Sequence, residues 1–554
     1  MESSENNLKT ILEKETNRIR SSYTGNDVIF ALIEFIRSID YQAFMLGHNL
    51  RPGDLALLQK YKFGWALPFK VFYQDLVLGE VPLFPSLKES YEWSDSIIQH
   101  AGSIQICYQL LDYLKADLMQ LEAQDQNHFI FKNLTDYPVE YFEHLSLDYY
   151  YSLVDQLLEE KGKKLVEELP RVRKKLEEIV NLEFDEFISY KANEEFDLFY
   201  KRFGYLYLMT SQTIDEFDEE DKFGEYLYKD YLDIAEYVCM EGIMHRDCCM
   251  ALAEKTSHKI YLRNILTHGF SIDKFVSSLS NYLDWEEAKT RQVVSCFAIT
   301  KENYLYHLSY PKASASPYFE LGKDIWVRST FGCLDRPVYF LNRELKRRFP
   351  TDYFNAVNNR ELRFKKQLYS FFEQDRFIKV EENIKIKIDK DTTDIDAVIY
   401  DKEKNVLALF QLKWQDTFYT SMKERFSRIS NLVPKSVEWI DKLERWLRGN
   451  QTKSILNTLR IKHDKIEDIF LFVIARNHMH FSNQKLDDRA VWASWYQIIE
   501  ASAKVKDPRM TNPIAEFAAK LKFFYPENRR QFEDAEMTKE ASFKFSRYKI
   551  TIKT

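Results

Sequence analysis

A small group of polar residues interrupts two apolar segments in the C-terminal part of the chain. The segment Thr393–Tyr400 contains Asp396, and the segment Leu407–Trp414 contains Gln411 and Lys413. Both segments are predicted to be strands, and the polar turn between them suits a hairpin. Gln411 and Lys413 are two residues apart and therefore project from the same face of their strand. If Asp396 faces them, the three side chains could bind a divalent metal and activate water against a phosphodiester.

The spacing of these residues resembles a known family. The pattern Asp396-x14-Gln411-x-Lys413, with Glu361 on a predicted helix upstream, is similar to the PD-(D/E)XK nuclease superfamily. The Gln-x-Lys form resembles the Mrr-like restriction endonuclease branch, in which Gln replaces the usual acidic residue. The resemblance covers about Asn358–Tyr496. It implies a restriction-endonuclease-like fold, cleavage of nucleic acid and a role in defence against foreign nucleic acid.

The resemblance also implies a role for each residue of the candidate site. Asp396 would be the principal ligand of Mg²⁺ or Mn²⁺, and Gln411 would add its side-chain oxygen to the metal or to a metal-bound water. Lys413 would orient or deprotonate the attacking water and offset the charge that develops on the phosphate. Glu361, or alternatively Glu373, would complete the metal shell from the helix.

The sequence departs from the family pattern at two positions. No proline precedes Asp396, and Gln411 supplies a neutral oxygen where a carboxylate is usual. Asp394, at a position that is often acidic or Gly in the family, is expected to have only a secondary role. Two alternatives to a nuclease site therefore stay open, namely a non-catalytic scaffold with a degenerate nuclease fold and a plain solvent-exposed hairpin.

Two further motifs allow other interpretations. Arg263 and His268 form an R-x4-H pattern, which resembles the motif of HEPN ribonucleases, metal-independent helical enzymes that cleave RNA. An ordinary surface Arg and His would give the same pattern. The segment Arg476–His480 follows a predicted strand, where its polar side chains could contact a phosphate or simply form a surface loop.

The elements around the candidate site form an α/β order. They are a helix at Asn358–Gln374, a strand or hairpin at Phe377–Ile388, the two motif strands, a helix at Thr420–Leu447, a strand at Ile469–Ala475 and a helix at Trp492–Lys504. This order is typical of an α/β sandwich with a small mixed sheet. We therefore expect an α+β multidomain protein, in which a large all-α N-terminal region precedes a C-terminal αβββαβ restriction-endonuclease-like domain.

The N-terminal region has few chain breakers and long amphipathic stretches. The whole chain of 554 residues contains only 14 Gly and 14 Pro, and its length predicts two to four domains. We expect a helical region at 1–310, as one domain or two subdomains, a linker or connecting segment at 311–350 and the nuclease-like domain at 351–554. Tyr150–Val180 predicts a long helical hairpin or arm, with Pro170 marking a break or the first turn of a second helix.

Charge and composition limit the partners. Residues 351–554 contain 38 Lys and Arg against 30 Asp and Glu, whereas residues 1–350 contain 40 against 56. The basic part is the one that a phosphate-binding domain needs, although segment charges also scatter by chance. We expect nucleic acid as the partner, DNA rather than RNA, with the helical region available for a homo-oligomer or a partner protein. The six cysteines form no CxxC pair, and no signal peptide or membrane-spanning run occurs, which predicts a cytoplasmic protein with no membrane partner.

Overall fold

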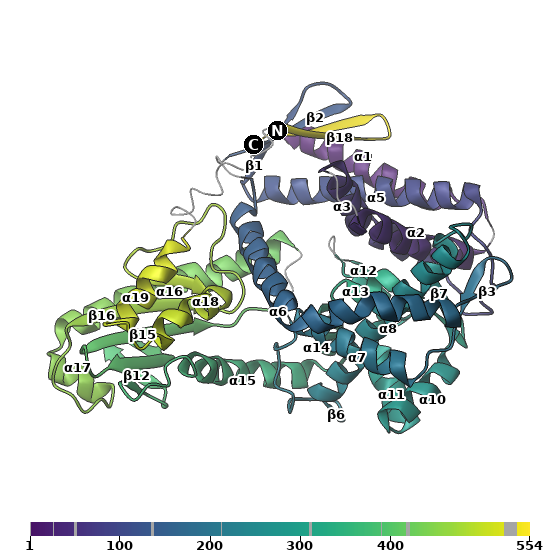
Figure 1. The fold of residues 1–554 in the computed structure, drawn as a ribbon. Helices are drawn as coiled ribbons and strands as arrows, with labels where there is room; N and C mark the ends of the chain where they lie inside the picture. The colour runs from purple at the N-terminus through teal and green to yellow at the C-terminus, as the bar shows by residue number, and fades with distance from the viewer. Residues whose placement is uncertain are drawn as a thin grey trace. The chain divides into compact units, whose positions relative to one another are not determined.

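The chain folds into helices and several small sheets (Figure 1). The computed structural model describes residues 2–25, 27–48, 52–134, 138–211, 213–309, 313–388, 391–416, 421–525 and 540–553. These residues divide into two compact units. Unit 1 comprises Met1–Lys132, Val154–Ala356 and Ala541–Lys553, and unit 2 comprises Asn133–Leu153 and Val357–Glu540.

Unit 1 contains most of the helices. They are α1 (Glu2–Ser21), α2 (Val28–His48), α3 (Pro52–Gly64), α4 (Ala66–Tyr73), α5 (Lys88–Lys115), most of α6 (Tyr141–Ile179), α7 (Glu194–Met209), α8 (Tyr228–Lys255), α9 (Arg263–Leu266), α10 (Ile272–Leu283), α11 (Glu287–Val294), α12 (Tyr304–Leu308), α13 (Thr330–Leu334) and α14 (Pro337–Arg348). A 3-10 turn, η1, spans Ser295–Phe297.

Unit 1 also contains strands, so the expectation of an all-α N-terminal region is wrong. The strands are β1 (Met119–Ala123), β2 (His128–Asn133), β3 (Asn181–Glu183), β4 (Phe187–Ser189), β5 (Lys222–Phe223), β6 (Tyr226–Leu227), β7 (Thr267–Ser271), β8 (Ala298–Ile299), β9 (Tyr318–Glu320), β10 (Ile325–Ser329), β18 (Glu540–Phe545) and β19 (Tyr548–Lys553). One four-stranded sheet has the order β7-β10-β9-β8 and another β1-β2-β19-β18. These strands have two to six residues, too few to give an alternating pattern that stands out among long helices.

The expected linker at 311–350 is part of the core of unit 1 in its described residues, 313–350. Ala315 and Ser316 are buried, and α14 buries nine consecutive residues, Pro337–Leu345. Gly332 of α13 lies so close to this segment that a Cβ atom there would meet the Ser316 carbonyl oxygen at 1.9 Å. The small residues of this segment permit the close packing, so its described part is not a linker.

A buried carboxylate joins α2 to the sheet of unit 1. Asp40 is 2% exposed; its Oδ1 accepts hydrogen bonds from the Ser329 hydroxyl at 2.5 Å and the Phe331 N–H at 2.9 Å. Its Oδ2 accepts the Thr267 hydroxyl at 2.6 Å. Burial raises the pKa of Asp40 to about 6, although all of these hydrogen bonds act in the opposite direction.

Unit 2 is built on one mixed five-stranded sheet. Its elements are α15 (Pro350–Tyr369, which begins in unit 1), β11 (Phe377–Lys379), β12 (Ile384–Ile388), β13 (Asp391–Ile395), β14 (Ala397–Asp401), β15 (Val406–Lys413), α16 (Met422–Gly449), α17 (Thr452–Thr458), β16 (Asp468–Ala475), β17 (Val491–Ser494), α18 (Trp495–Lys506) and α19 (Pro513–Phe523). The sheet order is β11-β14-β15-β16-β17, and β12 and β13 pair as a separate hairpin. β15 pairs antiparallel with β14 and parallel with β16, so it is a central strand.

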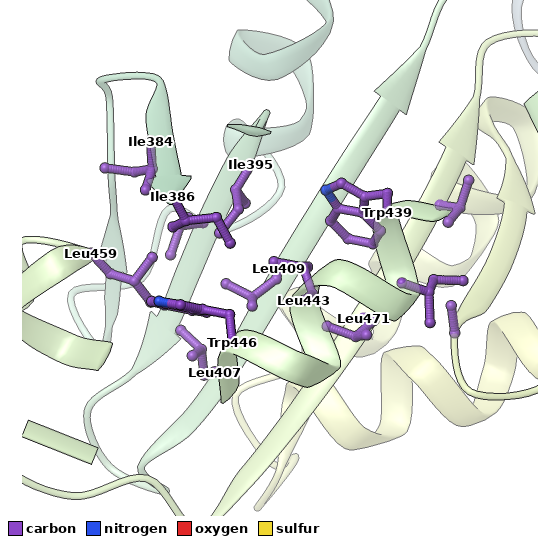
Figure 2. Packing of buried hydrophobic residues seen from close by; sticks show 14 of the residues in the cluster. Ile384, Ile386, Ile395, Leu407, Leu409, Trp439, Leu443, Trp446, Leu459 and Leu471 are labelled. Atoms are coloured by element: carbon purple, nitrogen blue, oxygen red, sulfur yellow. The ribbon is translucent and has the colours of Figure 1, made fainter. Parts of the chain in front are cut away.

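Both faces of this sheet are covered. Leu407 and Leu409 of β15 belong to the cluster on the face of α16, where Trp439 and Trp446 also lie (Figure 2). The intervening residues Val406, Ala408 and Phe410 belong to the opposite cluster, which includes Phe364 of α15 and Phe517 of α19. The alternation is the two-residue period of a strand, and burial on both sides explains why β15 is apolar almost throughout.

The division into units differs from the expected domain at 351–554. Its last residues belong to unit 1, where β19 pairs in parallel with β2. The expected helix at Trp492–Lys504 is a short strand, β17, followed by α18. The expected helix at Thr420–Leu447 corresponds to α16, with Thr420 outside the described residues. In the described part of the chain, no helix combines the length and apolar character needed to cross a bilayer.

Asp40 should make the stability of the protein fall as the pH rises. A carboxyl whose pKa is higher in the folded than in the unfolded state binds its proton more tightly when the protein is folded. Its contribution to the free energy of unfolding therefore declines between about pH 4 and pH 6 and is constant at higher pH. The difference in unfolding free energy between Asp40→Asn and the wild type should therefore grow by about 2–3 kcal/mol between pH 4 and pH 7. Urea denaturation across this range measures it. The exposed Glu287→Gln is the control, and a difference independent of pH would contradict the prediction.

Candidate active site

A β-bulge sets the position of Asp396. Ala397 is paired with Phe410, and the backbone N–H of Asp396 also donates to the Phe410 carbonyl at 3.1 Å, so two residues lie opposite one. The inserted residue shifts the alternation, since Ile395 and Val398 both lie in the cluster on the α16 face. Bulges re-aim a side chain and are frequent next to active sites.

The carboxylate of Asp396 is held against the backbone of β15. Its Oδ2 accepts the Leu412 N–H at 2.7 Å, and the Asp396 N–H donates to the Phe410 carbonyl. Asp396 is therefore bonded to the backbone on both sides of Gln411. The pKa of Asp396 is raised to about 6, chiefly by burial, and the Leu412 N–H and the Lys413 ammonium oppose this rise. A half-buried carboxylate that feels a nearby cation is a candidate ligand or acid–base group.

Gln411 is the polar exception in a buried strand. It is 6% exposed, and among the described residues its Oε1 accepts no hydrogen bond. Leaving a buried acceptor without a partner costs about 1–3 kcal/mol. By the alternation of β15, Gln411 and Lys413 follow Leu407 and Leu409 toward the face of α16. The Gln411 oxygen is therefore available to a bound water or a cation.

Lys413 lies at the end of β15, and the backbone there is fixed by β16. The N–H of Arg476 donates to the Lys413 carbonyl at 2.9 Å. The guanidinium of Arg476 lies 4.6 Å from the ring centre of Trp414 and 5.1 Å from that of Trp495, and it donates to Gln367 at 3.0 Å. Burial lowers the pKa of Arg476 to about 10. Arg476 thus acts as a packing group in this structure, and the phosphate contact considered for it stays a prediction.

The acidic residues considered for the site lie in different environments. Glu361 is exposed on α15, and its charge raises the pKa of Asp396, as does that of Asp394. Asp394 is exposed on β13, and its carbonyl accepts the Trp439 indole N–H at 2.8 Å. Glu373 is exposed and lies beyond the end of α15. Of the two glutamates, Glu361 is the one that acts electrostatically on Asp396.

The oxygen donors fit a metal that keeps much of its water. In the described chain, no three His, Cys, Asp or Glu side chains are grouped closely enough to hold a metal ion. A site built from Asp396 and Gln411 has two oxygen donors, and Mg²⁺ often binds through one or two carboxylates while it retains several waters. The buried, unpartnered Oε1 of Gln411 fits such a site, because a cation or its bound water would satisfy it.

The residues of the R-x4-H pattern have structural partners in unit 1. Arg263 is completely buried and donates to Asp95 at 3.0 Å, to the Ser94 hydroxyl at 2.7 Å and to Ser38 at 3.1 Å. Its guanidinium therefore cannot reach an RNA substrate in this conformation. His268 is on β7, and burial lowers its pKa.

Lys365 of α15 was missed by the sequence analysis. It is 2% exposed, and its ammonium and the Asp396 carboxylate interact electrostatically. The only sequence signal is its position, one helical turn after Glu361, which a charged helix face would also give.

No protein-family model, curated protein or solved structure matches the chain.

Gln411→Glu should strengthen metal binding. A carboxylate at this buried position, one residue before the N–H that binds Asp396, would add a negative charge near the end of β15 and supply the acidic ligand that the family pattern usually has. We expect a gain in Mn²⁺ affinity on the order of tenfold, about 1.4 kcal/mol, measured by isothermal titration calorimetry. Gln484→Glu, on an exposed loop, is the matched control. Equal or weaker Mn²⁺ binding by Gln411→Glu would contradict the assignment of Gln411 to the site.

Gln411→Met should stabilise the protein. The substitution keeps the side-chain length and removes an unpartnered buried acceptor, so the free energy of unfolding should rise by about 1 kcal/mol. The same change should weaken Mn²⁺ binding. Urea denaturation of this variant and of the exposed Gln484→Met tests the prediction, and a loss of stability confined to Gln411→Met would show that the amide is satisfied in solution.

Proposed function

We propose that unit 2 is a metal-dependent nuclease that hydrolyses phosphodiester bonds, with DNA as the expected substrate. The observation that carries the proposal is the meeting of three features at one end of β15. The Asp396 carboxylate is fixed by the Leu412 N–H, the neighbouring Gln411 oxygen has no partner in the described residues, and Lys413 ends the strand.

The topology of unit 2 supports the proposal. A helix, α15, precedes antiparallel strands that include β14 and β15, and α16 then leads to β16, which pairs in parallel with β15. If the separate β12–β13 hairpin and the short α17 are set aside, the order is similar to the αβββαβ arrangement that the PD-(D/E)XK resemblance implies. Gln411 and Lys413 lie on β15, Asp396 directly precedes β14, and Glu361 lies on α15.

The roles of the side chains follow from their chemistry. Asp396 and Gln411 would hold Mg²⁺ or Mn²⁺, and Glu361 would add negative charge from α15. The metal, when bound, would lower the pKa of a water and stabilise charge on the phosphate. Lys413 would orient the attacking water and interact with the non-bridging phosphate oxygens, whose negative charge grows as the new P–O bond forms and the ester bond breaks.

Substitutions at the strand ends test the proposed reaction. Asp396→Asn and Lys413→Ala should each lower the rate of metal-dependent cleavage at least about 100-fold, because each removes a charge that acts on the transition state. The assay uses the full chain with Mg²⁺ or Mn²⁺ on linear DNA, circular DNA and RNA in parallel. Lys402→Ala, in the exposed turn between β14 and β15, should cleave at the wild-type rate.

The other outcomes separate the alternatives. Undiminished metal-dependent cleavage by Lys413→Ala would refute the proposed site. Cleavage of RNA that persists in EDTA and is lost in His268→Ala would favour the metal-independent ribonuclease. Nucleic-acid binding without cleavage under any of these conditions would favour a scaffold with a degenerate nuclease fold.

A further inference from the structure

Three residues at four-residue spacing connect α15 with the strands that carry the candidate site. Glu361, Lys365 and Tyr369 share one face of the helix, since residues four apart are neighbours on its surface. Tyr369 is 4% exposed, and its hydroxyl donates to the Val380 carbonyl at 2.7 Å and accepts the Val398 N–H at 3.0 Å. Val398 is two residues after Asp396, so this contact fixes β14 next to the bulge.

Lys365 makes the next contact along the same face. Its ammonium donates to the carbonyl oxygens of Glu381 at 2.7 Å and Glu382 at 3.2 Å, and to Oδ1 of Asn383 at 3.3 Å. Three acceptors use all three of its N–H donors. The segment 381–383 connects β11 to β12, and the β12–β13 hairpin contains Asp394 and ends directly before Asp396.

The charge of Lys365 also acts on the site. Burial lowers the pKa of this lysine, while the carboxylates of Glu381 and Asp396 act in the opposite direction. A buried ammonium carries a desolvation cost of several kcal/mol, which its hydrogen bonds and nearby carboxylates must offset. A buried lysine therefore lowers the stability of a helix whose packing against the sheet requires only apolar residues.

We propose that Lys365 is a positioning residue, which fixes the segment 381–383 and thereby holds the Asp396 carboxylate at a set place relative to Glu361. This inference rests on the proposed function, because it assigns the purpose of the contact to the nuclease site. Lys365 itself would touch neither substrate nor metal. It acts through the β12–β13 hairpin and the bulge at Asp396.

Positioning and simple electrostatics predict opposite effects on metal binding. Loss of a nearby positive charge alone would make the site attract a divalent cation more strongly. Loss of the clamp would let Asp396 move away from its place and weaken binding. The sign of the change in Mn²⁺ affinity therefore distinguishes the two roles.

The test compares Lys365→Met, which removes the donors and the charge, with Lys365→Arg, which keeps both. Lys366→Met, at the exposed neighbouring position, is the matched control. We expect Lys365→Met to bind Mn²⁺ about tenfold more weakly, a change of about 1.4 kcal/mol, and to lower kcat with little change in KM. Backbone amides of residues 381–396 should exchange hydrogen faster in this variant, whereas Lys365→Arg should recover most of the wild-type behaviour.

Unchanged or tighter Mn²⁺ binding by a folded Lys365→Met variant would overturn the positioning role, as would unchanged hydrogen exchange in residues 381–396. If Lys365→Met does not fold, Lys365→Gln, whose shorter side chain and two N–H donors cannot serve all three acceptors, decides by the same two measurements. Failure of the wild type itself to bind Mn²⁺ would instead refute the proposed metal site. Hydrogen exchange would then still show whether the clamp exists.

Discussion

The burial of β15 on both faces is the constraint on which the architecture of unit 2 depends. Clusters from α16 on one side and from α15, α18 and α19 on the other leave no solvent along most of the strand. Lys413, the last residue of the strand, is partly exposed, and Gln411 is the one buried polar side chain in β15. The parallel partner β16 ends at the same level, where the Arg476 N–H bonds to the Lys413 carbonyl. An end of a sheet that is closed by packing and open to a few polar groups is a usual place for a ligand site.

The strands of unit 2 could be predicted because their sequences carry the signals of buried strands. The runs at 397–400 and 406–410 are apolar, and Ile384, Ile386 and Ile388 alternate with lysines, as a hairpin exposed on one face requires. The bulge at Asp396 could not be predicted, because it depends on the backbone of Phe410 in the neighbouring strand. The same holds for Lys365, whose role depends on carbonyl groups that any residue at 381 and 382 would supply.

Unit 1 shows where local patterns fail. Pro170 suggested a break, yet α6 continues through it from Tyr141 to Ile179. A proline removes one hydrogen bond and crowds the preceding turn, but packing of Leu165, Val172 and Leu176 in the core stabilises the helix on both sides. Arg263 could be part of a HEPN-like motif or an ordinary surface residue by its sequence, and it is fully buried and donates to Asp95. The residues next to Pro170 and Arg263 do not predict the continuous helix or the buried guanidinium, because both depend on packing against residues far away in the sequence.

The two carboxylates at the ends of β14 have very different sets of partners. Asp401, at the far end, is fully buried and pairs with Arg376 through two hydrogen bonds of 3.1 and 2.6 Å, while the N–H groups of the following turn also donate to it. This is a complete set of partners for a buried charge. Asp396 has the Leu412 N–H and, among the described residues, no ion pair, and its pKa is raised. A purely structural carboxylate would favour the first arrangement, because Asp401 shows that this sheet can place an arginine at hydrogen-bonding distance from a buried carboxylate. The second arrangement leaves Oδ1 of Asp396 and Oε1 of Gln411 without a hydrogen bond among the described residues, which lowers stability and keeps ligand positions available.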